Sequence, residues 1–118
     1  MKVWIGDPCY VLTPDQMNQV RDRWDPEVDV DETFTCVVYD TWNGDGTFHD
    51  QHGNEYIVDS GMICVIPECC IWEDRIDTHY PKCGVVHDDE EWKNFFVDDH
   101  SSVDGIIQFG DIIIPTGR

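Results

Sequence analysis

The sequence predicts one α+β domain built mainly on an antiparallel β-sheet, with two short helices packed against it. Runs of β-branched and aromatic residues clearly outnumber segments with helical spacing. Turns rich in glycine, asparagine and aspartate separate these runs, and such turns join antiparallel neighbours. A chain of 118 residues suits a single core, so we expect residues 1–118 to form one domain. An all-β sandwich or a small barrel is the alternative architecture.

The first part of the chain predicts a strand and then a helix. Residues 2–6 form a short apolar run that we expect to be a strand. A helix is expected over about residues 14–24, because Thr13 and Gln16 have the spacing of a capping box. Pro14 suits the first helical position. The apolar face of this helix, at spacings of three and four residues, contains Met17, Val20 and Trp24.

The middle of the chain predicts a meander of strands over residues 33–66. Residues 43–46 (Asn-Gly-Asp-Gly) have the composition of a hairpin turn, because asparagine and glycine tolerate positive φ. A second turn is expected at residues 52–54. The continuous apolar run at residues 62–66 predicts a buried strand.

The last part of the chain predicts a second helix and a final hairpin. The helix is expected over residues 88–96, with Asp88 as its cap and Glu91 at the capping-box position. The polar segment 100–102 is expected to be a turn. Two isoleucine-rich runs flank a Gly-Asp turn and predict a hairpin over residues 106–114.

The chain is strongly acidic. It contains 25 Asp and Glu against 7 Lys and Arg, which gives a formal charge of −18 spread over the whole length. With 41% hydrophobic and 12% aromatic residues, it is expected to be a folded domain with an acidic surface rather than a disordered acidic chain. Such a surface repels nucleic acid and anionic membranes and attracts basic proteins. We therefore expect a basic protein partner, with no direct contact to nucleic acid or membrane.

The sequence also bears on location. No apolar stretch is long enough to cross a bilayer, and residues 1–8 lack the apolar run of a signal peptide. We expect a cytoplasmic protein. Its six cysteines are then expected to be reduced thiols rather than a disulfide framework.

The most informative segment alternates acidic and apolar residues from position 25 to position 31. In a strand its carboxylates would form one row spaced by roughly 6.6 Å, with the apolar residues on the opposite face. Such a row can imitate a nucleic-acid backbone, or it can be the solvated side of an edge strand. We predict that a basic partner binds to Asp25, Glu27, Asp29, Asp31 and Glu32. A second acidic patch is expected at Asp88, Asp89, Glu90 and Glu91.

A zinc-stabilised module is one alternative. Zinc takes four sulfur or nitrogen ligands in a tetrahedron. The ligands available are Cys69, Cys70, His79, Cys83 and His87. The chain lacks the Cys-x-x-Cys spacing of familiar zinc sites, so scattered thiols and imidazoles explain the same residues. We therefore expect no cofactor.

A small-ligand-binding sponge protein is the other alternative, because Trp42 and Trp72 are expected to be partly exposed. The shortage of Lys and Arg argues against phosphorylated ligands. Catalysis is not expected. Ser60 lacks the strand–turn–helix context of a hydrolase nucleophile, and the chain has no phosphate-binding glycine loop.

Three short blocks carry a resemblance: Gly-Asp-Pro-Cys-Tyr-Val at 6–11, Gly-Asp-Gly-Thr at 44–47 and Val-Asp-Ser-Gly at 58–61. The chain resembles a group of small bacteriophage and bacterial proteins that share these blocks in this order, over residues 1–66. Small acidic phage proteins are often inhibitors of a host enzyme or defence system. The resemblance thus implies a non-enzymatic, anti-defence inhibitor in the host cytoplasm. Mimicry of DNA is its sharpest form.

Overall fold

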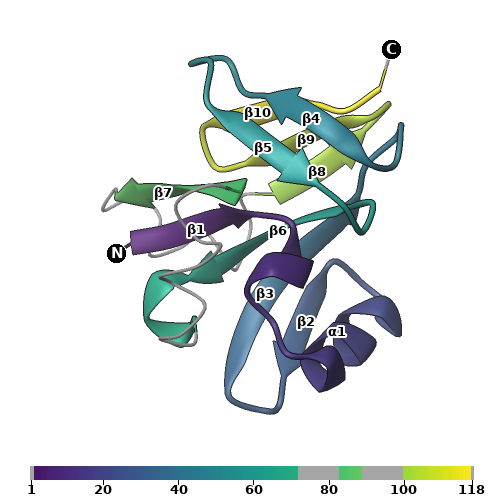
Figure 1. The fold of residues 1–118 in the computed structure, drawn as a ribbon, viewed down its shortest axis with the longest axis vertical. Helices are drawn as coiled ribbons and strands as arrows, with labels where there is room; N and C mark the ends of the chain where they lie inside the picture. The colour runs from purple at the N-terminus through teal and green to yellow at the C-terminus, as the bar shows by residue number, and fades with distance from the viewer. Residues whose placement is uncertain (1, 72–82, 89–99, 118) are drawn as a thin grey trace.

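Ten strands, one α-helix and two short 3₁₀ helices make up the part of the chain that the computed structural model describes, residues 2–71, 83–88 and 100–117 (Figure 1). This part is mainly antiparallel β and broadly α+β. The elements are, in chain order, β1 (Lys2–Gly6), η1 (Pro8–Tyr10), α1 (Pro14–Arg21), β2 (Glu27–Val30), β3 (Phe34–Asp40), β4 (Gly46–His49), β5 (Glu55–Val58), β6 (Met62–Pro67), η2 (Glu68–Cys70), β7 (Gly84–Asp88), β8 (His100–Val103), β9 (Ile106–Phe109) and β10 (Ile112–Pro115).

Five strands form the central sheet in the order β2-β3-β6-β1-β7, with every neighbouring pair antiparallel. β3 and β6 lie in its middle, where Val37 pairs with Val65. Residues 62–66 of β6 are all buried, because both faces of this strand are covered. β2 is at one end of the sheet, so β3 is its one strand neighbour in the described part of the chain.

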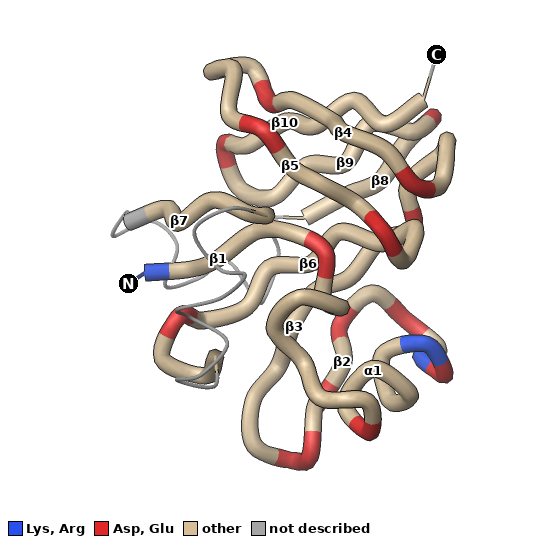
Figure 2. The backbone as a smooth tube through the Cα atoms, in the orientation of Figure 1, with Lys and Arg blue, Asp and Glu red and all other residues tan. Residues whose placement is uncertain are grey.

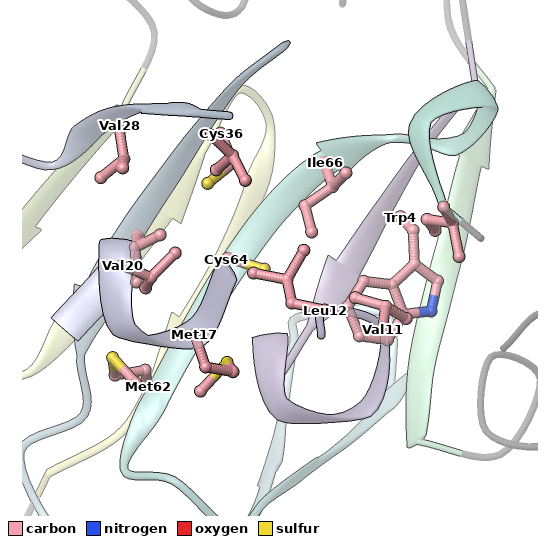
Figure 3. Packing of buried hydrophobic residues seen from close by; sticks show 13 residues of the cluster. Trp4, Val11, Leu12, Met17, Val20, Val28, Cys36, Met62, Cys64 and Ile66 are labelled. Carbon is pink, nitrogen blue, oxygen red and sulfur yellow. The ribbon is translucent and has the colours of Figure 1, made fainter. Parts of the chain in front are cut away.

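One face of the central sheet is covered by α1 and η1 (Figure 3). The helix-side core formed there contains Val11, Leu12, Met17, Val20, Val28, Val30, Cys36, Val38, Cys64 and Ile66. Trp4 belongs to the same core and is fully buried. Its indole lies beside Gly6 and Gly84, which pair across β1 and β7, and a Cβ on either glycine would lie within 2.6 Å of the ring. The two glycines therefore make room for the largest side chain of the core.

The other face of the central sheet packs against a second β layer. β4 and β5 form a two-stranded sheet, and β8, β9 and β10 form a three-stranded one. Figure 1 shows both small sheets together on one side of the central sheet. The core between the layers contains Val3, Ile5, Val37, Ile63 and Val65 from the central sheet with Tyr56, Val58, Ile107, Phe109, Ile112 and Ile114 from the small sheets. The central sheet is thus the middle layer of the fold.

The N-terminal strand and the capped helix are confirmed. Gln16 N–H donates to the Thr13 hydroxyl (3.3 Å) and Thr13 N–H donates to the Gln16 side chain (2.9 Å), which completes the capping box. The predicted end of the helix is wrong, because α1 stops at Arg21 instead of continuing to residue 24. Pro26 restricts only Asp25 to extended conformations. The chain leaves the α-helical pattern before that, at Arg23, whose N–H donates to the Val20 carbonyl three residues earlier (3.4 Å). As a result Trp24 is fully exposed and does not belong to the core.

The strands predicted between residues 33 and 66 are present, but their arrangement as one meander is wrong. β3 pairs with β2 and β6, whereas β4 pairs with β5. Residues 43–46 therefore carry the chain from one layer to the other instead of closing a hairpin. The reason is burial: β3 and β6 carry apolar residues on both faces and need the middle of a sheet, while β4 is mostly exposed. The turn predicted at residues 52–54 does join β4 to β5.

The C-terminal hairpin is confirmed as β9 and β10. The segment 100–102 is not a turn, because it lies in β8 and pairs with β9 across Asp104 and Gly105. These two residues have φ of 52° and 81°, and positive φ at both central positions is what a type I′ hairpin turn requires. The helix predicted over 88–96 falls outside the described residues except at Asp88. That residue is the last of β7.

Candidate protein-binding surface

β2 presents its acidic residues to solvent and its apolar residues to the core. Glu27 and Asp29 are exposed, while Val28 and Val30 are buried. Asp25, just before the strand, is exposed as well. The alternation predicted from the sequence is therefore present in β2, and its buried half anchors the strand to the helix-side core.

Two contacts orient the exposed carboxylates. The Thr35 hydroxyl on β3 donates a hydrogen bond to Asp29 Oδ1 (2.7 Å). Glu27 Oε1 lies 3.9 Å from Nε2 of His100 on β8, and Nδ1 of the same ring lies 2.5 Å from the Tyr39 hydroxyl. Asp29 is thus held by the neighbouring strand, and Glu27 lies where the central sheet approaches the C-terminal sheet.

The acidic row ends in the tight turn between β2 and β3. Thr33 N–H donates to the Val30 carbonyl (2.9 Å), and the intervening Asp31 and Glu32 have φ of 53° and 58°. This left-handed conformation is unfavourable for residues with a side chain, although aspartate tolerates it better than most. Both acidic residues are exposed, but they no longer follow the extended geometry of the row.

Asp31 is tied to α1. Its carboxylate accepts hydrogen bonds from the side-chain amides of Gln19 (2.5 Å) and Gln16 (3.0 Å), and its backbone N–H donates to Gln19 Oε1 (2.7 Å). Donation from Gln19 and then Gln16 lowers the pKa of the Asp31 carboxyl. Three hydrogen bonds therefore bind Asp31 to α1, and the extended row stops before it.

Among the described residues, the Lys and Arg nearest to this surface lie at the end of α1. Figure 2 shows Lys and Arg at the N-terminus and at the end of this helix, while Asp and Glu are spread over both β layers. Arg23 is occupied, because it forms an ion pair with Asp40 (2.8 Å) and donates to the Val20 carbonyl (3.0 Å). In the described part of the chain no Lys or Arg pairs with the row, so the charge of these carboxylates faces solvent.

An open hollow of about 600 Å³ lies at the start of the row. Its lining includes Arg21, Arg23, Trp24, Asp25, Tyr39 and Asp40. The hollow therefore combines aromatic rings with groups of both charges. Trp24 is the most exposed large apolar side chain of the described residues. Tryptophan is one of the residue types enriched among the hot spots of protein–protein interfaces.

The second predicted acidic patch, Asp88, Asp89, Glu90 and Glu91, lies mostly outside the described residues. Asp88 alone is placed, at the end of β7. β7 and β2 are at opposite ends of the central sheet, so Asp88 belongs to a different part of the molecule from the row. The candidate surface is therefore built on β2 and the segment before it.

The predicted zinc ligands are not gathered where the chain is described. Cys69 and Cys70 lie on η2 with their sulfurs 3.9 Å apart. Cys83 directly precedes β7, which contains His87, while His79 falls outside the described residues. Within residues 2–71, 83–88 and 100–117 no three Cys, His, Asp or Glu side chains come together as a metal site. The six cysteines are thiols and form no disulfide bond.

Three of the thiols, Cys9, Cys36 and Cys70, are not activated for nucleophilic chemistry. Burial raises the pKa of Cys36 to about 12, and burial with a contact to Cys69 raises that of Cys70 to about 11. Burial and the neighbouring Asp7 carboxylate raise the pKa of Cys9 as well. Because the thiolate is the reactive form, these cysteines are inert at neutral pH.

Asp7 forms a buried hydrogen-bond centre that sequence reasoning missed. Its carboxylate is fully buried and accepts hydrogen bonds from the backbone N–H groups of Cys9 (2.8 Å), Asp59 (2.7 Å) and Ser60 (2.6 Å). The Ser60 hydroxyl donates a further one (2.6 Å). The available signal was the Asp-Pro pair, since an aspartate before proline is a common cap of a helical turn, here η1.

The three blocks noted in the sequence meet at this centre. Asp7 links the block at 6–11 to the block at 58–61, and the Tyr10 hydroxyl bonds to the Asp59 carboxylate. The block at 44–47 lies beside the block at 58–61, because a Cβ built on Gly61 would be 3.9 Å from the Cα of Gly44. The blocks therefore have a structural role: they fix the crossing point between the two layers.

Comparison with known proteins leaves the chain without an assigned family. No family model, no curated protein and no solved structure matches it. In the described ranges no helix has the length and apolar character needed to cross a membrane. The charge and geometry of the β2 surface are therefore the basis for a proposal of function.

Proposed function

We propose that this protein is a non-enzymatic binding module whose acidic edge strand engages a basic surface on another protein in the cytoplasm. The observation that carries the proposal is the alternation in β2, where Glu27 and Asp29 face solvent while Val28 and Val30 are buried. A rigid strand fixes the carboxylates before the partner arrives, so little conformational entropy is lost on binding. The overall charge of −18 steers basic partners towards the surface and repels acidic ones.

Inhibition of a host or defence protein by nucleic-acid mimicry is the sharpest form of this proposal. Proteins that bind nucleic acid hold Lys and Arg in grooves that meet phosphates, and these contacts supply most of their non-specific affinity. A row of carboxylates can occupy such a groove. If so, duplex DNA and this protein compete for the same partner, and added salt weakens both complexes.

A matched pair of charge variants tests the proposed surface. The row variant carries Asp25→Asn, Glu27→Gln and Asp29→Asn. The control carries Glu55→Gln, Asp104→Asn and Asp111→Asn, which removes the same charge from exposed positions in the other layer. A partner is first captured from host lysate at low salt and purified, and its affinity is then measured for each variant. The proposal expects about a tenfold loss or more for the row variant alone. An equal loss in both variants, or none, contradicts the site.

The hollow beside Trp24 favours a second candidate, binding of a small planar anion such as a nucleotide. Trp24 offers a stacking surface and Arg21 an exposed guanidinium, both in its lining. Ligand-induced change in tryptophan fluorescence, followed by loss of the response in Trp24→Ala and Arg21→Ala, would favour it. The row variant helps to distinguish the two candidates. Of its three substitutions only Asp25→Asn lies in the lining of the hollow, so the other two should not affect binding of a small anion there.

A further inference from the structure

We propose that the outer edge of β2 accepts an extended basic segment of the partner, which pairs with it as a sixth strand of the central sheet. The inference rests on the proposed function, in that the partner is basic. It adds the mode of binding: backbone hydrogen bonds to a sheet edge, with side-chain charge selecting the segment.

The backbone pattern identifies the groups available at this edge. In an antiparallel pair, residues alternate between those that bond to the partner strand and those that point away from it. The Pro26 carbonyl accepts from Val38 N–H (2.8 Å), and Val28 pairs with Cys36 two positions along in the same register. Even-numbered residues of β2 therefore bond to β3. The N–H and C=O groups of Glu27 and Asp29 point outwards, away from the sheet.

The fold closes this edge beyond residue 30. The next outward N–H belongs to Asp31, and it already donates to the Gln19 side chain of α1 (2.7 Å). A docked strand therefore finds outward donors at Glu27 and Asp29 and none at Asp31. This limits the pairing to a short stretch that begins near Asp25 and ends at Asp29.

The charge of the β2 edge decides what kind of segment docks. Exposed sheet edges invite pairing with other chains, and charged side chains on the edge restrict which chains pair. A second copy of this chain would place carboxylate against carboxylate, which is unfavourable. A strand with Lys or Arg at alternate positions places cations beside Glu27 and Asp29 instead.

The hollow at the start of the row suits one end of such a segment. Asp25 and Trp24 are part of its lining. A Lys or Arg side chain entering there meets a carboxylate and an aromatic face, and both attract a cation. The hollow and the edge thus form one continuous surface for a basic strand.

Amide hydrogen exchange on the full-length protein tests the mode directly. The probe is a peptide of about seven residues that alternates lysine and valine, long enough for a typical strand. Its control is the same peptide with every backbone nitrogen methylated, which keeps the charge and removes the donors on both edges. With the unmodified peptide we expect exchange at the Glu27 and Asp29 amides to slow by about tenfold or more, with Val28 and Val30 unchanged. The methylated peptide should give no such protection.

Two variants provide an independent readout. Asp29→Asn removes the charge alone, whereas Asp29→Pro also removes an outward N–H that β3 does not use, and proline is tolerated at such edge positions. If the edge pairs with the peptide, Asp29→Pro weakens binding more than Asp29→Asn does, while thermal unfolding shows both variants folded.

The outcomes separate the inference from the proposed function. Salt-sensitive binding of both peptides without amide protection, or equal affinities of the two variants, overturns the edge-pairing mode and leaves the charged surface in place. If neither peptide binds at low salt, both the edge-pairing mode and the proposed acidic binding surface are overturned.

Discussion

Asp7 and Ser60 are joined twice, since the backbone N–H and the hydroxyl of Ser60 each donate to the Asp7 carboxylate at 2.6 Å. The two residues lie 53 positions apart in the chain, and Asp7 is fully buried. A buried carboxylate is tolerated only where donors replace its hydration. Asp7 thus makes the junction between β1 and the end of β5 depend on one side chain.

Removing this charge should be costly. Asp7→Asn replaces an acceptor oxygen with a donor NH₂ that faces other donors, so we expect a loss of about 3 kcal/mol in the free energy of unfolding. Ser60→Ala removes one hydrogen bond to a charged group and should cost about 1.5 kcal/mol. Urea unfolding measures both. If Asp7→Asn costs less than Ser60→Ala, the carboxylate does not organise the junction.

The turn after β2 predicts a stabilising substitution. Glu32 has φ of 58°, a conformation that glycine adopts without steric cost. Glu32→Gly should therefore raise the free energy of unfolding by about 0.5–1 kcal/mol. Glu32→Ala is the matched control, because it removes the same charge and keeps the strain. Equal effects of the two substitutions would assign the gain to charge and not to the backbone.

The packing of Trp4 predicts a destabilising substitution at Gly84. A Cβ on Gly84 would lie 2.4 Å from the Trp4 ring and 2.5 Å from the Ile5 carbonyl oxygen. Backbone cannot move aside cheaply, so Gly84→Ala should cost about 2 kcal/mol or more. Val86→Ala, at an exposed position of the same strand, should cost clearly less. Chemical denaturation with near-ultraviolet circular dichroism follows both stability and the Trp4 environment, and a neutral Gly84→Ala would contradict this packing.

Local patterns in the sequence predicted local structure well. The capping box at Thr13 and Gln16 and the alternation of β2 depend on residues close in the chain, and both are present. The alternation gave the exposed carboxylates, but it did not reveal that Asp31 is bound by Gln16 and Gln19, which lie 15 and 12 residues away.

Pairing between distant segments was not predictable in the same way. Val37 meets Val65 because both strands need burial on two faces, and no short-range pattern encodes that choice. For Trp24 a short-range pattern was present, but it led to a wrong prediction. Its spacing from Val20 fits a helical face, but the helix ends before the spacing has any effect. The Asp104-Gly105 turn was predictable, since this dipeptide is a strong hairpin signal.

The Asp50 carboxylate, in the second β layer, predicts that the free energy of unfolding falls at acid pH. Asp50 is buried and accepts hydrogen bonds from Asn54 N–H (3.0 Å), the Asn54 side chain (2.9 Å) and the Tyr56 hydroxyl (2.7 Å). Burial alone raises the pKa of Asp50, but donation from Asn54 and Tyr56 outweighs it, and the pKa is lowered. The unfolded chain, with an aspartate pKa of about 3.9, therefore takes up this proton first.

Stability from Asp50 should be complete above the unfolded pKa and fall as the pH drops towards the folded one. We expect the free energy of unfolding to decline below about pH 4, with a shallower decline in Asp50→Asn, which lacks the titrating group. Urea titrations between neutral and acid pH measure the slopes. Identical slopes in the two proteins would show that Asp50 does not contribute.

Truncation of Trp24 and of Trp42 to alanine should have opposite effects on stability and on partner binding. Trp24 is fully exposed, so Trp24→Ala should change the free energy of unfolding by less than about 0.5 kcal/mol. Trp42 is partly exposed, but its Cβ and ring lie close to Gly105 and Gly117, and Trp42→Ala should destabilise the C-terminal sheet. Binding of the basic partner should show the reverse order: Trp24→Ala weakens it by about tenfold, as expected of an aromatic anchor beside Asp25. A Trp24→Ala protein that is stable and binds with unchanged affinity would remove the hollow from the binding surface and confine the interaction to the edge of β2.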